Sequence, residues 1–106
     1  MNNDRELLEQ AAKAAGLHHP DGFEWITNEL GFQWNPLTDD GDALRLSVKL
    51  LIELNHNHFQ QTVDAWYSPD FSQHRIKLTE DYGDDQYAAT RRAIVRAAAE
   101  IGKEQK

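Results

Sequence analysis

The spacing of apolar residues changes between segments of this chain, and that change constrains its fold most strongly. Apolar residues recur at helical spacing in residues 3–15, in residues 39–54 and from Asp85 to about Ile101. Residues 59–79 instead alternate apolar and polar side chains, with the period of two that is typical of half-buried strands. We therefore predict an α+β domain in which three main α-helices pack, sandwich-like, on a small antiparallel sheet.

The first and last helices have the best-marked ends. Asn3 can cap the first helix and Glu6 completes a capping box, while Asp84 or Asp85 can cap the last, which is expected to end before Gly102. The residues expected to face the core are Leu8, Ala11, Ala12 and Ala15 in the first helix and Tyr87, Ile94, Ala97, Ala98 and Ile101 in the last. Their regular spacing predicts two amphipathic helices.

The helix predicted over residues 39–54 is the richest in large apolar residues. Thr38, Asp39 or Asp40 can cap its start. Its main apolar stripe consists of Leu44, Val48, Leu51 and Leu54, widened by Leu46, Leu50 and Ile52. So broad an apolar face predicts the central helix of the domain.

The alternating segment predicts a β-hairpin with a turn at Ser68-Pro69-Asp70. The residues of one parity, expected to face inward, are Phe59, Val63, Ala65 and Tyr67 in the first strand and His74, Ile76 and Leu78 in the second. An isolated hairpin is only marginally stable in water, so we expect it to lie against the helices, with a third strand as an option.

Residues 17–37 have the least regular pattern. A short helix over residues 23–30 and a short strand containing Phe32 and Trp34 are the expected elements. Trp34 directly precedes Asn35-Pro36, where a large ring can cover the start of the next helix. We expect Trp34 to be a core residue.

Length and composition describe one small domain spanning residues 1–106. A core of this size gives modest stability, which a homodimer could supplement. The apolar runs are too short for a membrane span, and no basic-then-apolar leader opens the chain. There is no cysteine, so neither a disulfide framework nor a thiolate site is available. These features favour a reducing cytoplasm, with no membrane partner.

The formal net charge of −7 is concentrated in two segments that contain no lysine or arginine. The acids of the first segment are Asp21, Glu24, Glu29, Asp39, Asp40 and Asp42, and those of the second are Glu80, Asp81, Asp84 and Asp85. Binding to a phosphate backbone depends on lysine and arginine, so direct nucleic-acid binding is disfavoured. Attraction to a basic protein surface is favoured.

No residue pattern in the chain predicts catalysis, a metal site or a cofactor. His56, His58 and His74 could converge on zinc, but surface histidines explain them better, since no HExxH spacing accompanies them. The run Asp39–Asp42 lacks the remainder of a calcium loop, and helix capping accounts for it. Nucleophile-elbow, Walker and dinucleotide-binding motifs are also missing. We therefore expect a protein that binds and does not catalyse.

Two tryptophans are candidates for contact with a partner. The parity of Trp66 places it with Asp64 on the polar side of its strand, so the ring is exposed unless the hairpin is covered on both faces. Trp25 lies in the first acid-only segment. Arg91, Arg92 and Arg96 could form an anion site, but a solvated face paired with nearby acids is the preferred interpretation.

Two segments resemble small bacteriophage and prophage proteins of the phage ABA sandwich domain type. They are Trp34 to Leu46, with its W-N-P motif and acidic helix start, and Ala89 to Ala99; residues 7–16 also fit. The resemblance implies helices packed on a small sheet and a phage setting. It implies no catalytic residue.

In such a setting, small acidic proteins often act on the host, and anti-CRISPR proteins are one group of these. We therefore expect an accessory protein in the cytoplasm of the bacterial host that binds a host protein, with a basic nucleic-acid-binding surface of a Cas complex as the preferred partner. The expected contact residues are Asp21, Glu24, Trp25, Glu29, Asp39, Asp40, Asp64, Trp66, Glu80, Asp81, Asp84 and Asp85. A phage structural or morphogenesis protein is the alternative, and an enzyme or small-ligand binder is the third.

Overall fold

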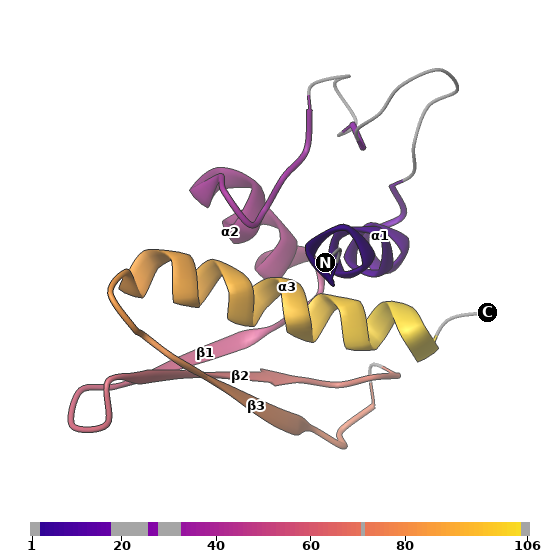
Figure 1. The fold of residues 1–106 in the computed structure, drawn as a ribbon. Helices are drawn as coiled ribbons and strands as arrows, with labels where there is room; N and C mark the ends of the chain where they lie inside the picture. The colour runs from indigo at the N-terminus through magenta and orange to yellow at the C-terminus, as the bar shows by residue number, and fades with distance from the viewer. Residues whose placement is uncertain (1–2, 18–25, 28–32, 71, 105–106) are drawn as a thin grey trace.

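Helix α3 (Gln86–Glu104) is the element on which the rest of the fold is assembled. The computed structural model describes residues 3–17, 26–27, 33–70 and 72–104. A three-stranded sheet covers one side of α3, and helices α1 (Asn3–Ala15) and α2 (Asp40–Lys49) lie on the other side (Figure 1). The predicted α+β class is confirmed.

The sheet is antiparallel with the strand order β1-β2-β3. Its strands are β1 (Glu53–Asn57), β2 (Thr62–Tyr67) and β3 (Ile76–Asp81), and Ala65 at the centre of β2 lies opposite Leu54 and Leu78. Val63, Ala65 and Tyr67 are buried, which confirms the predicted parity of β2. The optional third strand exists as β1, but it occupies residues 53–57, which overlap the end of the predicted second helix.

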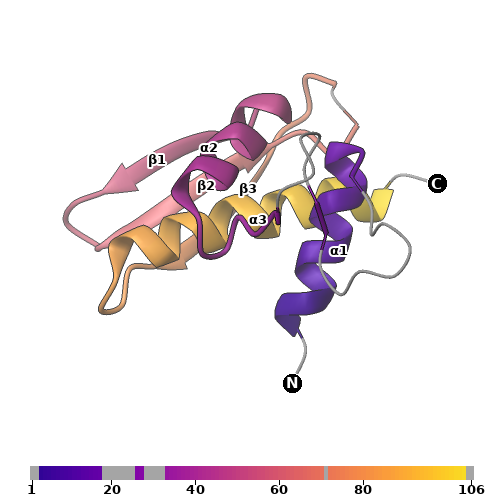
Figure 2. The same cartoon turned by 90° about the horizontal axis from the view of Figure 1, so that it is seen from above.

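Small residues allow α1 and α3 to pack closely. Figure 2 shows α1 crossing α3 in its C-terminal half. Ala11, Ala97 and Ala98 are fully or almost fully buried, and Gly102 is buried as well. A Cβ atom on Gly102 would overlap the backbone carbonyl of Gln10. The prediction that the last helix ends before Gly102 was wrong, because this glycine permits a close helix contact and does not end α3.

Helix α2 is shorter than predicted and turns a different face to the core. It ends at Lys49, and Leu51 follows with a left-handed φ of 58°. The buried apolar residues are Ala43, Leu46 and Leu50, whereas Leu44, Val48 and Leu51 of the predicted stripe are 64%, 65% and 75% exposed. The predicted role of α2 as the central helix was therefore wrong, and α3 has that role.

Three further expectations are corrected where the structure describes them. Phe59 lies in the β1–β2 turn and is 94% exposed, and Tyr87 on α3 is 66% exposed, so neither belongs to the core. Thr27 forms an isolated antiparallel bridge with Gln33 and is not helical. The other residues of the predicted helix over 23–30, and Phe32, lie outside the described residues.

Trp34 is a core residue as predicted, since it is 6% exposed. Its backbone N–H donates to the carbonyl of Ile26 at 2.8 Å, and Ile26 is also buried. Among the helices in the described parts of the chain, none combines the length and apolar character needed to cross a bilayer.

Candidate functional site

The second acid-only segment lines a hollow at the corner where β3 leads into α3. This corner hollow has a volume of about 330 Å³. Its lining residues are Leu37, Glu80, Asp81, Tyr82, Asp84, Asp85, Ala88, Ala89 and Arg92. Four predicted contact residues, Glu80, Asp81, Asp84 and Asp85, thus meet at one place.

The turn from β3 into α3 holds these acids through backbone contacts. The Tyr82 N–H donates to the Gln61 carbonyl at 2.8 Å, which fixes the end of β3 to the β1–β2 turn. Gly83 has a φ of 61°, a conformation that glycine adopts without strain. Asp85 then caps α3, because its Oδ1 accepts hydrogen bonds from the N–H groups of Tyr87 and Ala88, each at 3.0 Å.

Contacts with α3 hold Leu37 at the corner hollow. The Arg91 guanidinium donates from Nε to the Leu37 carbonyl at 2.9 Å and from Nη1 to Asp40 at 2.5 Å. These two bonds tie the segment before α2 to the first half of α3. The hollow therefore joins residues that are more than forty positions apart in the chain.

Asp81 and Asp84 are the carboxylates of the hollow that remain available. Both are exposed, and neither has an ion-pair or hydrogen-bond partner among the described residues. Glu80 is paired with Arg96, and the Asp85 carboxylate accepts a capping hydrogen bond at the start of α3. Among the described lining residues the one cation is Arg92, which contacts the Asp4 carboxylate at 3.2 Å. The hollow thus carries unbalanced negative charge.

The apolar lining residues lie deeper than the free carboxylates. Ala89 is buried and Leu37 and Ala88 are half-buried, whereas Asp81 and Asp84 are exposed. A lysine or arginine side chain matches this arrangement, because its aliphatic stem can cover apolar surface while its charged head binds carboxylates.

The first acid-only segment does not form a comparable surface where it is described. Asp39 caps α2 by accepting from the Asp42 N–H at 2.8 Å, and Asp40 is paired with Arg91. Asp42 is buried and binds both the Asn35 N–H and the Arg45 guanidinium at 2.9 Å. The remaining predicted contact residues of this segment, Asp21, Glu24, Trp25 and Glu29, lie outside the described residues.

Trp66 lies on the face of the sheet opposite α3 and is half-buried. Its ring is flanked by the Arg75 guanidinium and the Lys77 ammonium, each 5.7 Å from the ring centroid. Asp64, its predicted acidic neighbour, accepts a hydrogen bond from the Thr79 hydroxyl at 2.7 Å. Cations therefore border this tryptophan, and it is not part of the corner hollow.

The three arginines of α3 each have an acidic partner. Arg91 is paired with Asp40, Arg92 with Asp4 and Arg96 with Glu80. The predicted pairing of these arginines with nearby acids is confirmed, but the predicted solvated face is not confirmed at Arg91, whose side chain is only 17% exposed.

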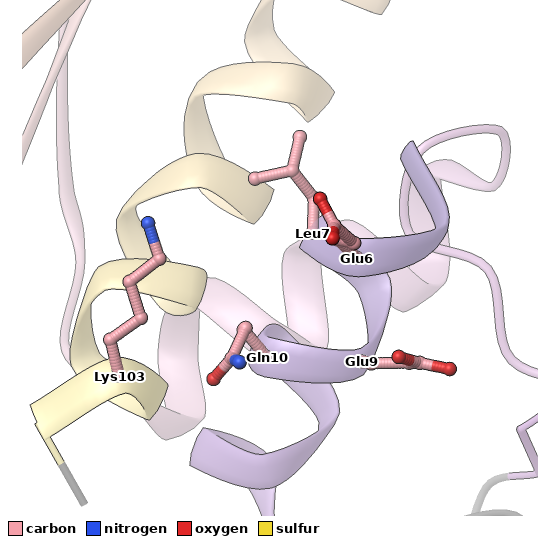
Figure 3. Close-up of a pocket in the computed structure, with 5 residues that line it drawn as sticks. All are labelled: Glu6, Leu7, Glu9, Gln10 and Lys103. Carbon is pink, nitrogen blue, oxygen red and sulfur yellow. The ribbon is translucent and has the colours of Figure 1, made fainter. Parts of the chain in front are cut away.

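A second hollow, of about 510 Å³, lies between α1 and the end of α3 (Figure 3). It is lined by Glu6, Leu7, Glu9, Gln10 and Lys103. The Gln10 Oε1 atom is buried without a hydrogen-bond partner among the described residues, and Lys103 Nζ contacts Glu100 at 3.0 Å. Because Oε1 is closed to solvent, a ligand in this hollow would not reach it, so the hollow is the weaker candidate.

The described histidines do not gather into a metal site. His56 Nδ1 lies 2.5 Å from the Tyr82 hydroxyl, and His58 packs edge-on against Phe59. Within the described ranges no group of three or more histidine and carboxylate side chains is arranged to hold a metal ion. His18 and His19 lie outside those ranges.

Comparison of the chain with protein families, with curated proteins and with solved structures gives no match. The function is therefore argued from the corner hollow and the charge distribution around it.

Proposed function

We propose that this chain is a non-catalytic binding protein that holds a basic side chain of a protein partner in the corner hollow. The observation that carries the proposal is the position of Asp81 and Asp84, two unpaired carboxylates beside a half-buried apolar lining. Carboxylates that accept from a guanidinium or an ammonium form the stronger, charge-assisted class of hydrogen bond.

The whole-molecule charge supports the same kind of partner. A net charge of −7 attracts a basic protein surface and accelerates encounter with it. Long-range attraction alone does not give a tight complex, because exposed charge pairs contribute little to affinity unless their geometry is fixed. The hollow supplies a local contact of fixed geometry.

The resemblance to phage ABA sandwich proteins suggests the setting. We propose a phage or prophage accessory protein acting in the host cytoplasm, with a basic nucleic-acid-binding surface of a Cas complex as the partner. Arginine pairing of Asp40 and Glu80, and capping by Asp39 and Asp85, leave fewer free acids than the sequence contains. The proposed contact is accordingly narrower than a charged surface spread over both acid-only segments.

The test is binding of purified Cas effector complexes, free of target DNA, to the wild-type chain and to the double variant Asp81→Asn/Asp84→Asn. Loss of two charge-assisted contacts should weaken binding by about tenfold or more. The matched control is Glu6→Gln/Glu104→Gln, which removes the same charge from exposed acids outside the corner hollow. It should bind as the wild type does, apart from a small common effect on the association rate.

Equal weakening by both double variants would show that total charge, and not the corner hollow, determines binding. Absence of binding to every Cas complex would reject the partner, and a normal affinity of Asp81→Asn/Asp84→Asn would reject the site.

A further inference from the structure

Strand β3 forms an open edge of the sheet. The strand order β1-β2-β3 gives it one neighbour, β2, and leaves its other side unpaired within the described part of the chain. Lys77, Thr79 and Asp81 along this strand are exposed. An edge strand presents a row of backbone N–H and C=O groups that can pair with a further strand.

The hydrogen bond just beyond β3 shows which residues turn their backbone groups toward β2. The Tyr82 N–H donates to the Gln61 carbonyl, so these two residues form a hydrogen-bonded pair. In an antiparallel ladder, hydrogen-bonded pairs recur at every second residue. Continuing the register from this pair makes Glu80 and Leu78 the residues of β3 that bond to β2.

The backbone groups of the alternate residues, Lys77, Thr79 and Asp81, therefore point to the open edge. Their side chains lie on the face of the sheet that carries Trp66, since Lys77 is opposite Trp66 in the register. Among the described residues, neither Lys77 nor Asp81 has an ion-pair partner. The open edge thus combines unpaired backbone groups with one available cation and one available anion.

Antiparallel pairing with the same edge of a second copy gives both charges a partner. With a two-fold axis at Thr79, Lys77 of each copy lies directly opposite Asp81 of the other. Opposite charges in directly opposed positions stabilise an antiparallel pair. On the other face Ile76, which is 37% exposed, lies opposite Tyr82 of the second copy and is covered by it.

The charges of β3 also select this register. Moving the axis from Thr79 to Leu78 or Glu80 loses both Lys77–Asp81 pairs, and moving it to Lys77 or Asp81 places like charges opposite each other. A lysine on an edge strand ordinarily opposes pairing, because its charge meets no partner. Here the second copy supplies that partner.

We propose that β3 pairs edge to edge with β3 of a second copy, which joins the two three-stranded sheets into one continuous antiparallel sheet. The inference goes beyond the proposed function, because it uses the backbone edge of β3 and a partner identical to the chain itself. Asp81 belongs to both surfaces, so dimer formation competes with a basic side chain for this carboxylate and leaves Asp84 available. A short edge buries less than the about 800 Å² per partner of a standard interface, so the dimer is weak and reversible.

The first experiment measures self-association by sedimentation equilibrium. Lys77→Asp and Asp81→Lys each place like charges opposite each other, so each should raise the dimer dissociation constant by about tenfold or more. An equimolar mixture of the two variants restores opposite charges at both positions. It should form a heterodimer as tight as the wild-type homodimer.

The matched controls are Lys13→Asp and Glu6→Lys, which make the same charge changes at exposed positions of α1. Each should self-associate as the wild type does, and their mixture should gain nothing. Asp84→Asn should also leave the dimer unchanged. Because Lys77 lies outside the corner hollow, failure of the edge and failure of the hollow are distinguishable.

The second experiment locates the contact by amide hydrogen exchange of the wild-type chain below and above the dissociation constant. The N–H groups of Lys77, Thr79 and Asp81 should exchange more slowly at the higher concentration, because they become bonded to the second copy. Those of Leu78 and Glu80, already bonded to β2, should change little.

Four results would overturn the inference. They are a wild-type chain that stays monomeric at about 1 mM, single variants that associate as the wild type does, a mixture of Lys77→Asp and Asp81→Lys that associates no better than either variant alone, and concentration-dependent protection that lies outside β3.

Discussion

Among single residues, Asp85 stabilises the fold, whereas its neighbour Asp84 does not. Only Asp85 caps α3, through hydrogen bonds to two backbone N–H groups. Asp85→Ala should lower the free energy of unfolding by about 1 kcal/mol. Asp84→Ala is the matched control and should change it by less than about 0.5 kcal/mol. Urea unfolding measures both, and an equal effect of the two variants would contradict the cap assignment.

Leu51 allows backbone strain to be measured directly. Because its φ of 58° suits glycine, Leu51→Gly should raise the free energy of unfolding by about 1 kcal/mol. Leu51→Ala retains the Cβ atom and should bring no such gain. Thermal or urea unfolding of the two variants measures both changes in stability. A loss of stability in Leu51→Gly would show that the exposed leucine contributes more packing than its exposure indicates.

The stability of the fold at alkaline pH should depend on the ionisation of Tyr67. Its burial, and secondarily the Glu100 carboxylate, raises the pKa of the phenol above its ordinary value of 10.0. Above that pH the unfolded chain loses this proton first, so the native state becomes relatively less stable as the pH rises. Tyr67→Phe removes this contribution. The melting temperature of the wild type should therefore fall more steeply above about pH 10 than that of the variant, and parallel curves would refute the prediction.

At the scale of elements, the crossing of α1 and α3 depends on Gly102. Alanine usually stabilises a helix interior relative to glycine by about 1 kcal/mol. Here the added Cβ atom would overlap the Gln10 carbonyl, and backbone cannot move aside as a flexible side chain can. Gly102→Ala should instead destabilise the fold by about 1–3 kcal/mol. A variant at least as stable as the wild type, in urea unfolding, would contradict the observed crossing.

The sequence predicted most of these elements but not which face of α2 is buried. The helix over residues 3–15, the last helix and the parity of β2 are confirmed because each has one clear apolar face. Helix α2 has apolar residues on two sides, so periodicity could not choose between them. The buried polar residues Asp42 and Ser47 are satisfied by nearby backbone groups, since Asp42 accepts the N–H of Asn35 in the segment before α2 and Ser47 donates to the Leu44 carbonyl within the helix.

Charge patterning predicted the acids of the corner hollow but not its shape. Residues 80–85 were recognisable as an acid-only segment. That Leu37 joins them follows from the contacts of Arg91 with Leu37 and Asp40, which no local pattern indicates. Pairing of Glu80 with Arg96 is equally a tertiary feature. Local sequence therefore shows where charge is abundant, and the fold determines which charges remain free.

At the scale of the whole molecule, charge and apolar surface are separated. The corner hollow presents free carboxylates, whereas the exposed apolar residues Leu44 and Val48 lie on α2, outside the hollow. A chain with a net charge of −7 is attracted to basic surfaces over distances near the Debye length, so binding through the hollow should weaken as salt is added.

Binding of a basic side chain in the corner hollow can be observed residue by residue in an NMR titration. Hexa-arginine peptide is added to the ¹⁵N-labelled full chain, and amide shifts are followed to saturation. We expect the largest changes at Asp81, Asp84 and Ala88, and we expect them to be lost in Asp81→Asn/Asp84→Asn but not in Glu6→Gln/Glu104→Gln. Changes of similar size at exposed acids throughout the chain, or an unchanged response of the first variant, would contradict it.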